Sequence, residues 1–245
     1  MVFADIHSHI LWNVDDGASS EGMMYQMVDK VYADGVRLLC LTPHFHPGYF
    51  GDNRQKSEES FAQLRAYVSE KYPDMELLLG NELRYSPGCG VWLKEGACRT
   101  LNGFDLVLVD FAAYEKGSQI VCGLNRLMSM GYVPILAHAE RYPNLSAAMV
   151  RTLCRNGVHL QITASSLWGG FGFGAMLRAR RLLRRRAVAL AGSDAHDLKR
   201  RPPEIARGYR IARKITGEAY ACGVFYRNAD KLLKNIQEGM EQKDE

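Results

Sequence analysis

The 245-residue sequence predicts an α/β barrel of seven parallel strands, and three observations support this fold class. Short runs rich in Val, Ile and Leu alternate with amphipathic stretches, as in βαβ units. The length suits one domain with a single core, and α/β barrels commonly reach this size. Seven strands with crossovers also fit an open doubly wound sheet. Ionisable residues at one strand end after another favour the barrel, where functional groups gather at the carboxyl ends of the strands.

The seven expected strands are apolar runs of strand length. They lie at residues 2–7, 36–42, 76–83, 104–111, 133–138, 158–164 and 187–194. A helix at 20–35 begins at serines that can cap it and ends at Gly35. Further helices are expected at 55–72, 202–217 and 228–240, the last with Asn228 as its N-cap.

No linker, low-complexity segment or solenoid repeat divides the chain. We therefore expect a single domain covering residues 1–245, with a polar helical tail at 235–245. The N-terminus lacks the basic and apolar regions of a signal peptide, and no apolar run approaches the ~20 residues that span a bilayer. These features predict a cytoplasmic protein without membrane insertion.

The six cysteines form no C-x-x-C pair, which suits reduced thiols better than disulfides or a zinc knuckle. None is followed by Arg six positions later, so the thiolate loop of cysteine-dependent phosphatases is missing. The net charge of +4 is mild and excludes few partners.

Six of the seven histidines lie where predicted strands end. His7 and His9 are two residues apart, so on an extended chain both rings point to the same side. Only His159 begins a strand, and we assign it a structural role. Carboxylates also occur at these ends, and so many buried ionisable groups need ions to balance them.

The expected metal ligands are five imidazoles and four carboxylates: His7, His9, His44, His138, His196, Asp16, Glu82, Asp110 and Asp194. One tetrahedral ion takes about four ligands, so two or three divalent ions are implied. Mixed nitrogen and oxygen ligands favour manganese, iron or zinc over calcium. Paired ions of this kind activate water and bind phosphoryl oxygens, which indicates hydrolysis. Arg141, three residues beyond His138, can bind phosphate. Arg200 and Arg201 follow the seventh strand, and we expect one of them to face the same anion.

Five ordered motifs resemble the PHP (polymerase and histidinol phosphatase) superfamily, and most closely the manganese-dependent protein tyrosine phosphatases of bacterial capsule and exopolysaccharide operons. The motifs are "DIHSHILWNVDDGA", "TPHFHPGYF", "GNELRY", "LAHAERYP" and "GSDAHD". The resemblance covers nearly the whole chain. It implies a distorted seven-stranded barrel of PHP type, a metal site at the carboxyl ends of the strands, and a phosphotyrosine substrate on the tail of a bacterial tyrosine kinase.

The resemblance also implies specific roles for residues. One metal would be held by His7, His9, Glu82 and Asp194, a second by Glu82, Asp110 and His138, and a third by Asp16, His44 and His196. Arg141 matches the phosphate-binding arginine of the family, and Arg201 matches an arginine near the site.

The chain departs from the family pattern at three positions. Asp110 stands where Glu is usual, so its side chain is one methylene shorter. The family motif "TPHH" is replaced by "TPHFH" in this chain. His44 therefore matches the first histidine of the motif, whereas His46 does not match the second, and we interpret His46 as a supporting or proton-transfer group. Ala139 replaces a proline before the Glu-Arg pair, which loosens the loop that carries Arg141.

The mechanism we expect is attack of a hydroxide shared by two ions on the phosphorus of phosphotyrosine, without a phosphoenzyme. Two alternatives stay open. One is another PHP phosphoesterase activity, on histidinol phosphate or nucleic acid, and the other is a metal-binding regulatory scaffold without catalysis. A nuclease needs a basic track with stacking aromatics, and we predict no nucleic-acid partner. The sequence leaves the oligomeric state open.

Overall fold

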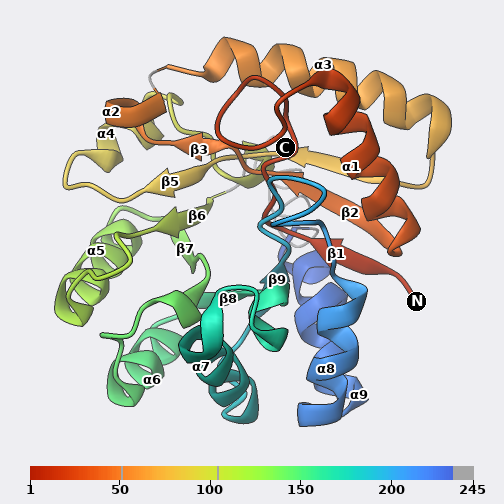
Figure 1. Cartoon of the computed structure of the whole chain (residues 1–245). Coiled ribbons are helices and arrows are strands. Elements are labelled where there is room, and N and C mark those ends of the chain that lie inside the picture. Colours follow the sequence, from red (N-terminus) through yellow and green to blue (C-terminus); the bar gives the residue numbers. More distant parts are fainter. Residues whose placement is uncertain (51, 104, 234–245) are drawn as a thin grey trace, which may run out of the picture.

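The computed structural model describes residues 1–50, 52–103 and 105–233. Parallel strands curl around the centre, and most of the helices lie outside them (Figure 1). The α/β class predicted from the alternating pattern is therefore confirmed. The strands are β1 (Phe3–Asp5), β2 (Val36–Leu41), β3 (His44–Phe45), β4 (Glu76–Leu79), β5 (Glu82–Arg84), β6 (Leu106–Asp110), β7 (Val133–Leu136), β8 (His159–Thr163) and β9 (Leu190–Gly192).

The second and third predicted strands are each broken into two segments. The described chain therefore contains nine strand segments, and the predicted count of seven strands is not confirmed. Pro43 stands between β2 and β3 and has no N–H to donate to a neighbouring strand. Gly80 stands between β4 and β5, where an added Cβ would lie 2.6 Å from the Leu101 side chain.

Hydrogen bonds define a three-stranded sheet in the order β1-β2-β4 and a six-stranded sheet in the order β3-β5-β6-β7-β8-β9. The chain keeps its direction across both breaks. Gly80 N donates to Leu41 O at 2.9 Å, and Glu82 N donates to Pro43 O at 3.1 Å. The two sheets therefore continue into one another.

The segments that follow β1 and β9 also lie side by side. Asp194 N donates to His7 O at 2.8 Å, and Ser8 and Ala195 form an isolated parallel bridge. Residues near the start of the chain and residues about 190 positions later thus meet where strands end.

Two apolar clusters occupy the two faces of the sheet. On β6, Val107 and Val109 pack in the larger cluster with the buried helix residues, whereas Leu106 and Leu108 belong to the smaller one. This separation follows from the two-residue period of a strand. The smaller cluster fills the inner face of the curled sheet and includes Ala4, Ile6, Leu38, Cys40, Leu78, Ile135, Leu190, Ala229 and Leu233.

The α-helices are α1 (Glu21–Ala33), α2 (Pro47–Phe50), α3 (Arg54–Lys71), α4 (Cys89–Lys94), α5 (Gly117–Ser129), α6 (Ala147–Arg155), α7 (Gly172–Arg184), α8 (Ala206–Thr216) and α9 (Glu218–Cys222). Short 3₁₀ turns η1 (Leu101–Gly103), η2 (Ala139–Arg141) and η3 (Ala164–Trp168) and a π-helix η4 (Gly223–Arg227) complete the fold. None of the helices within the described ranges is both long and apolar enough to cross a membrane.

Helix ends agree with the sequence at some positions and not at others. Ser20 caps α1 as predicted, because its side chain accepts from Met23 N at 3.2 Å. Asn228 is not an N-cap, since it has helical dihedral angles and continues the turn of η4. The predicted tail at 235–245 lies outside the described residues.

Candidate metal centre

The ionisable side chains singled out in the sequence lie together at the carboxyl ends of the strands. His7 and His9 follow β1, His44 begins β3 and Glu82 begins β5. Asp110 ends β6, His138 follows β7, and Asp194 and His196 follow β9; Asp16 comes from the loop between β1 and α1. All of these side chains except His44 and Asp16 are almost completely buried.

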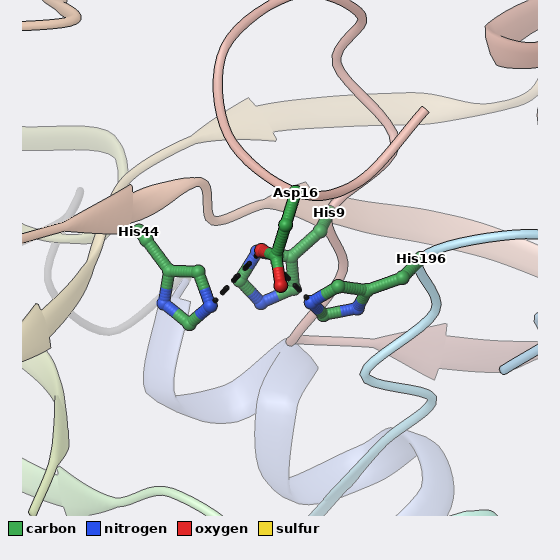
Figure 2. A group of neighbouring side chains, drawn as sticks. All are labelled: His9, Asp16, His44 and His196. Carbon is green, nitrogen blue, oxygen red and sulfur yellow. Dashed lines mark ion pairs between the residues drawn. The ribbon is translucent and has the colours of Figure 1, made fainter. Parts of the chain in front are cut away.

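Three groups of these residues bring ligand atoms close enough to share an ion. They are His7, His9 and Asp194; Glu82, Asp110 and His138; and His9, Asp16, His44 and His196. Within each group the candidate ligand atoms lie within 4.8 Å of one another. In Figure 2, Asp16 lies between the rings of His44 and His196, at 3.4 and 3.5 Å from their Nε2 atoms.

Glu82 is the centre of the cluster. Its Oε2 lies 2.8 Å from His44 Nδ1, and its Oε1 lies 2.9 Å from His138 Nε2. His7 and His9 each approach it to 3.4 Å. Burial raises the pKa of the Glu82 carboxyl, but the charges of His7 and His44 and hydrogen bonds from the rings outweigh it and hold the pKa well below its usual range.

The donor set fits divalent cations. His7 Nε2 and His9 Nε2 face each other at 3.1 Å. The lone pairs of two unprotonated nitrogens repel each other at this distance unless a proton or a metal ion lies between them. His138 Nδ1 and His196 Nε2 are buried, and neither has a hydrogen-bond partner among the described residues. Imidazole nitrogens and carboxylate oxygens without a thiolate suit manganese, iron and zinc.

Two residues that sequence reasoning missed hold the candidate ligands in place. Asp15 Oδ2 lies 2.7 Å from His9 Nδ1 and accepts from His44 N at 2.9 Å. Gln161 Oε1 accepts from His138 N at 2.7 Å and lies 3.3 Å from His7 Nδ1. Such partners fix the ring orientation of metal-binding histidines. The doubled aspartate in "DDGA" and a glutamine inside an apolar strand were the available signals.

Asp110, the residue that departs from the family pattern, has its own partners. Tyr142 OH donates to Asp110 Oδ1 at 2.9 Å, and Arg84 Nη2 lies 2.9 Å from Oδ2. Burial raises the pKa of the Asp110 carboxyl, and the charge of Glu82 adds to this effect. Its Oδ1 lies 3.7 Å from His138 Nε2, so the shorter side chain still reaches its predicted group.

A cavity of about 220 Å³ opens beside the cluster. Its lining includes Glu82, Asp110, His138 and Asp194 together with Arg84, Arg141 and Arg201. The structure therefore brings both predicted phosphate-binding arginines to the candidate metal ligands.

Arg141 and Arg201 both contact Asp194. Arg201 Nη2 lies 2.5 Å from Asp194 Oδ1, and Arg141 Nη2 pairs with Oδ2. The Nε atoms of both arginines are buried and have no hydrogen-bond partner among the described residues. His138 and Asp194 both have positive φ, 34° and 53°, a conformation that non-glycine residues rarely adopt and that is concentrated at functional sites.

The remaining histidines and the cysteines belong to none of the three groups among the described residues. His46 stacks on Tyr49 at 5.9 Å and belongs to none of the three groups, and His159 begins β8 as predicted. Cys40, Cys89 and Cys98 are buried, and burial raises the pKa of each thiol. No cysteine lines the cavity among the residues that the structure describes.

Comparisons with known proteins agree with this geometry. The chain is 32% identical over 236 residues to tyrosine-protein phosphatase CpsB of Streptococcus pneumoniae, covering 94% of this chain and 97% of that protein. One solved chain, described under "Crystal structures of YwqE from Bacillus subtilis and CpsB from Streptococcus pneumoniae, unique metal-dependent tyrosine phosphatases", matches with a TM-score of 0.81 and 26% identity over 90% of each chain.

A more distant likeness concerns the fold alone. Histidinol phosphate phosphatase of Lactococcus lactis matches with a TM-score of 0.56 and 15% identity, covering 89% of this chain and 94% of that one. The family model described as "Capsular polysaccharide synthesis, CpsB/CapC" matches residues 3–234. With nearly the whole chain matched, this protein belongs to the CpsB/CapC family.

Proposed function

We propose that this protein is a metal-dependent protein-tyrosine phosphatase that acts on a phosphorylated bacterial tyrosine kinase and so regulates capsule or exopolysaccharide synthesis. One observation carries the proposal: three groups of imidazoles and carboxylates converge beside a cavity that arginines line. The names of the CpsB and YwqE relatives support the same activity.

The proposed metal ligands are the nine residues predicted from the sequence. His7, His9, Glu82 and Asp194 would hold one ion, Glu82, Asp110 and His138 a second, and Asp16, His44 and His196 a third, with His9 also near the third. Manganese is the proposed metal, in two or three sites, with iron or zinc as substitutes. Bound divalent ions would lower the pKa of a water molecule so that it can attack as hydroxide, and would neutralise negative charge on the phosphoryl oxygens.

The residues of the chain itself perform the binding steps. Arg141 and Arg201 line the cavity and would donate N–H groups to the phosphoryl oxygens and neutralise their charge. Tyrosine leaves as a phenol with a pKa near 10, so a strong general acid is not required. Because no cysteine lines the described cavity, hydrolysis proceeds without a cysteinyl phosphate.

The finer description of the fold belongs to the same proposal. The nine strand segments would form seven positions of one closed, distorted barrel of PHP type, with the metal site at the carboxyl ends of its strands. The continuity of β2 with β3 and β4 with β5, and the Ser8–Ala195 bridge, support this closure. We propose a single domain for residues 1–245. The cytoplasmic location and the kinase partner stay predictions.

The test compares substrates on the same protein. With manganese, we expect turnover of an aryl phosphate and of a phosphotyrosyl peptide, and loss of both with a chelator. Histidinol phosphate and single-stranded DNA serve as competing substrates. Faster turnover of either one, or aryl phosphatase activity that survives complete metal removal, would overturn the proposal. If the wild type shows no phosphatase activity and a Glu82→Ala variant still binds the kinase, the protein is a regulatory scaffold and not an enzyme.

A further inference from the structure

The ring of Phe171 lies against the two arginines of the candidate site. Arg141 Cζ lies 3.6 Å from the centre of this ring, and Arg201 Cζ lies 5.4 Å from it. We propose that Phe171 is a positioning residue, which holds the guanidinium groups of Arg141 and Arg201 in the orientation that binds a phosphoryl group. This inference rests on the proposed function.

The local sequence "GGFGFG" explains why one ring projects at this point. Gly169 and Gly172 have φ of 97° and 85°, which strongly favours glycine. A Cβ on Gly170 would lie 2.9 Å from the Ser165 side chain. The turn between η3 and α7 therefore accepts a large side chain at Phe171 but not at its neighbours.

The contact orients Arg141 without using any of its hydrogen-bond donors. An aromatic face attracts a guanidinium stacked over it, whereas the N–H groups lie in the guanidinium plane. Arg141 Nη2 donates to Thr163 Oγ1 at 3.1 Å and pairs with Asp194, and its Nε–H keeps no partner among the described residues. A polar residue in place of Phe171 would compete for these donors.

Phe171 acts through the arginines and not on the substrate. Arg141 and Arg201 line the cavity, but Phe171 is not among the described lining residues. The side chains of the arginines are 20% and 29% exposed, so a cation–π contact at this place is partly shielded from water. Losing the ring releases the guanidinium groups while every metal ligand stays in place.

The experiment measures inorganic phosphate binding to the manganese-loaded protein by calorimetry. We expect Phe171→Leu to weaken phosphate binding about tenfold, equivalent to about 1.4 kcal/mol. Phe171→Tyr keeps the aromatic face and should stay within about twofold of the wild type. Phe173→Leu is the matched control, because Phe173 lies two residues further on, at the start of α7, is 69% exposed, and should leave binding unchanged.

A double-mutant cycle tests whether the effect passes through Arg141. Arg141→Lys should weaken phosphate binding less in the Phe171→Leu background than in the wild type, because the oriented planar fork is already lost. Additive effects would overturn the proposal. So would unchanged phosphate affinity combined with a raised KM for the phosphotyrosyl peptide, since the ring would then contact the substrate.

Thermal unfolding and manganese content separate positioning from a structural role. Both should match the wild type in Phe171→Leu, with Phe171→Met as the second variant if the leucine protein does not fold. Equal losses of phosphate affinity in the Tyr and Leu variants would contradict the proposal. Because phosphate binding needs no turnover, a wild type that hydrolyses no phosphotyrosine would refute the proposed function and still allow this inference to be judged.

Discussion

The inner face of the curled sheet changes character along a single strand. On β6, Leu106 and Leu108 lie in the apolar inner cluster, and Asp110, two residues further on the same face, belongs to the candidate metal centre. We call the apolar inner cluster, which includes Leu106 and Leu108, the floor, and the candidate metal ligands, which include Asp110, the mouth. All three residues are at least 95% buried, so burial is shared and only the chemistry differs.

The floor and the mouth make opposite demands on the protein. Removing the floor side chains from water stabilises the fold by itself. The mouth buries Glu82, Asp110 and Asp194, and buried carboxylates are costly unless positive charge compensates them. Floor residues therefore contribute chiefly to folding, and mouth residues contribute chiefly to ion binding and activity.

The largest expected effect comes from Glu82→Gln in the mouth. We expect aryl phosphatase activity to fall by about 10³-fold, equivalent to about 4 kcal/mol of activation free energy, because the carboxylate shared by two of the proposed ion sites loses its charge. Manganese binding should raise the Tm of the wild type, and this rise should disappear in the variant. Glu76→Gln, at an exposed glutamate that begins β4, is the matched control and should keep both properties. If the Glu82→Gln variant keeps activity within tenfold of the wild type, Glu82 is not a metal ligand.

The second effect tests the floor. Leu108→Ala should lower the free energy of unfolding by about 3 kcal/mol, because it leaves a cavity in a fully buried cluster. Chemical denaturation with and without manganese measures this loss, which should be the same in both conditions. Manganese affinity of the folded variant should be unchanged. A tenfold loss of manganese affinity would contradict the claim that floor residues contribute to folding and not to ion binding.

A smaller effect is expected at the edge of the mouth. Asp15→Asn should weaken manganese binding by about 10–100-fold, because the side chain that orients the His9 ring loses its charge. Calorimetric titration measures the change. Asp29→Asn, at an aspartate on α1 that pairs with Lys71, is the control outside the site. Equal affinity in the Asp15 variant and the wild type would contradict its orienting role.

The smallest effect is a pH dependence. Burial lowers the pKa of His44, but the carboxylates of Glu82, Asp15 and Asp16 outweigh it and raise the pKa to about 9. In the metal-free protein, the resulting stabilisation is complete below the unfolded value near 6.5 and is lost as the pH rises towards 9.

Manganese binding has the opposite sign, because it requires a neutral imidazole. Apparent affinity should therefore rise by up to about tenfold per pH unit between pH 7 and 8.5 as the proton of His44 is displaced. Titrations across this range measure the slope. His44→Gln should flatten it and His159→Gln should not, and a slope that persists in the His44 variant would assign the proton to another group.

Much of the fold and of the candidate site was predictable from local sequence. The apolar runs predicted the α/β class, because strand and helix periods are written in neighbouring residues. Ser20 and Gly35 marked the limits of α1 because a cap acts within a few residues. His7 and His9 indicated a metal site because two residues on an extended chain share a side.

Other features depended on contacts between distant segments. Asp15 and Gln161 were missed because each also binds a residue far away in the sequence, His44 and His138 respectively. The break before β5 could not be predicted because it depends on the close approach of Leu101 to Gly80. Helix α8 begins only at Ala206 because Asp34, far away in the sequence, accepts from Ile205 N and Ala206 N. The contact of Phe171 with Arg141 belongs to the same class.

The alternating pattern, the helix caps and the ionisable residues at the strand ends can all be found in short stretches of the sequence, because each involves only a few consecutive residues. Which of those ionisable residues meet depends on packing between distant segments. Packing of the curled sheet sets the distances between strand ends, and hydrogen bonds and ion pairs weaken steeply over an ångström or two.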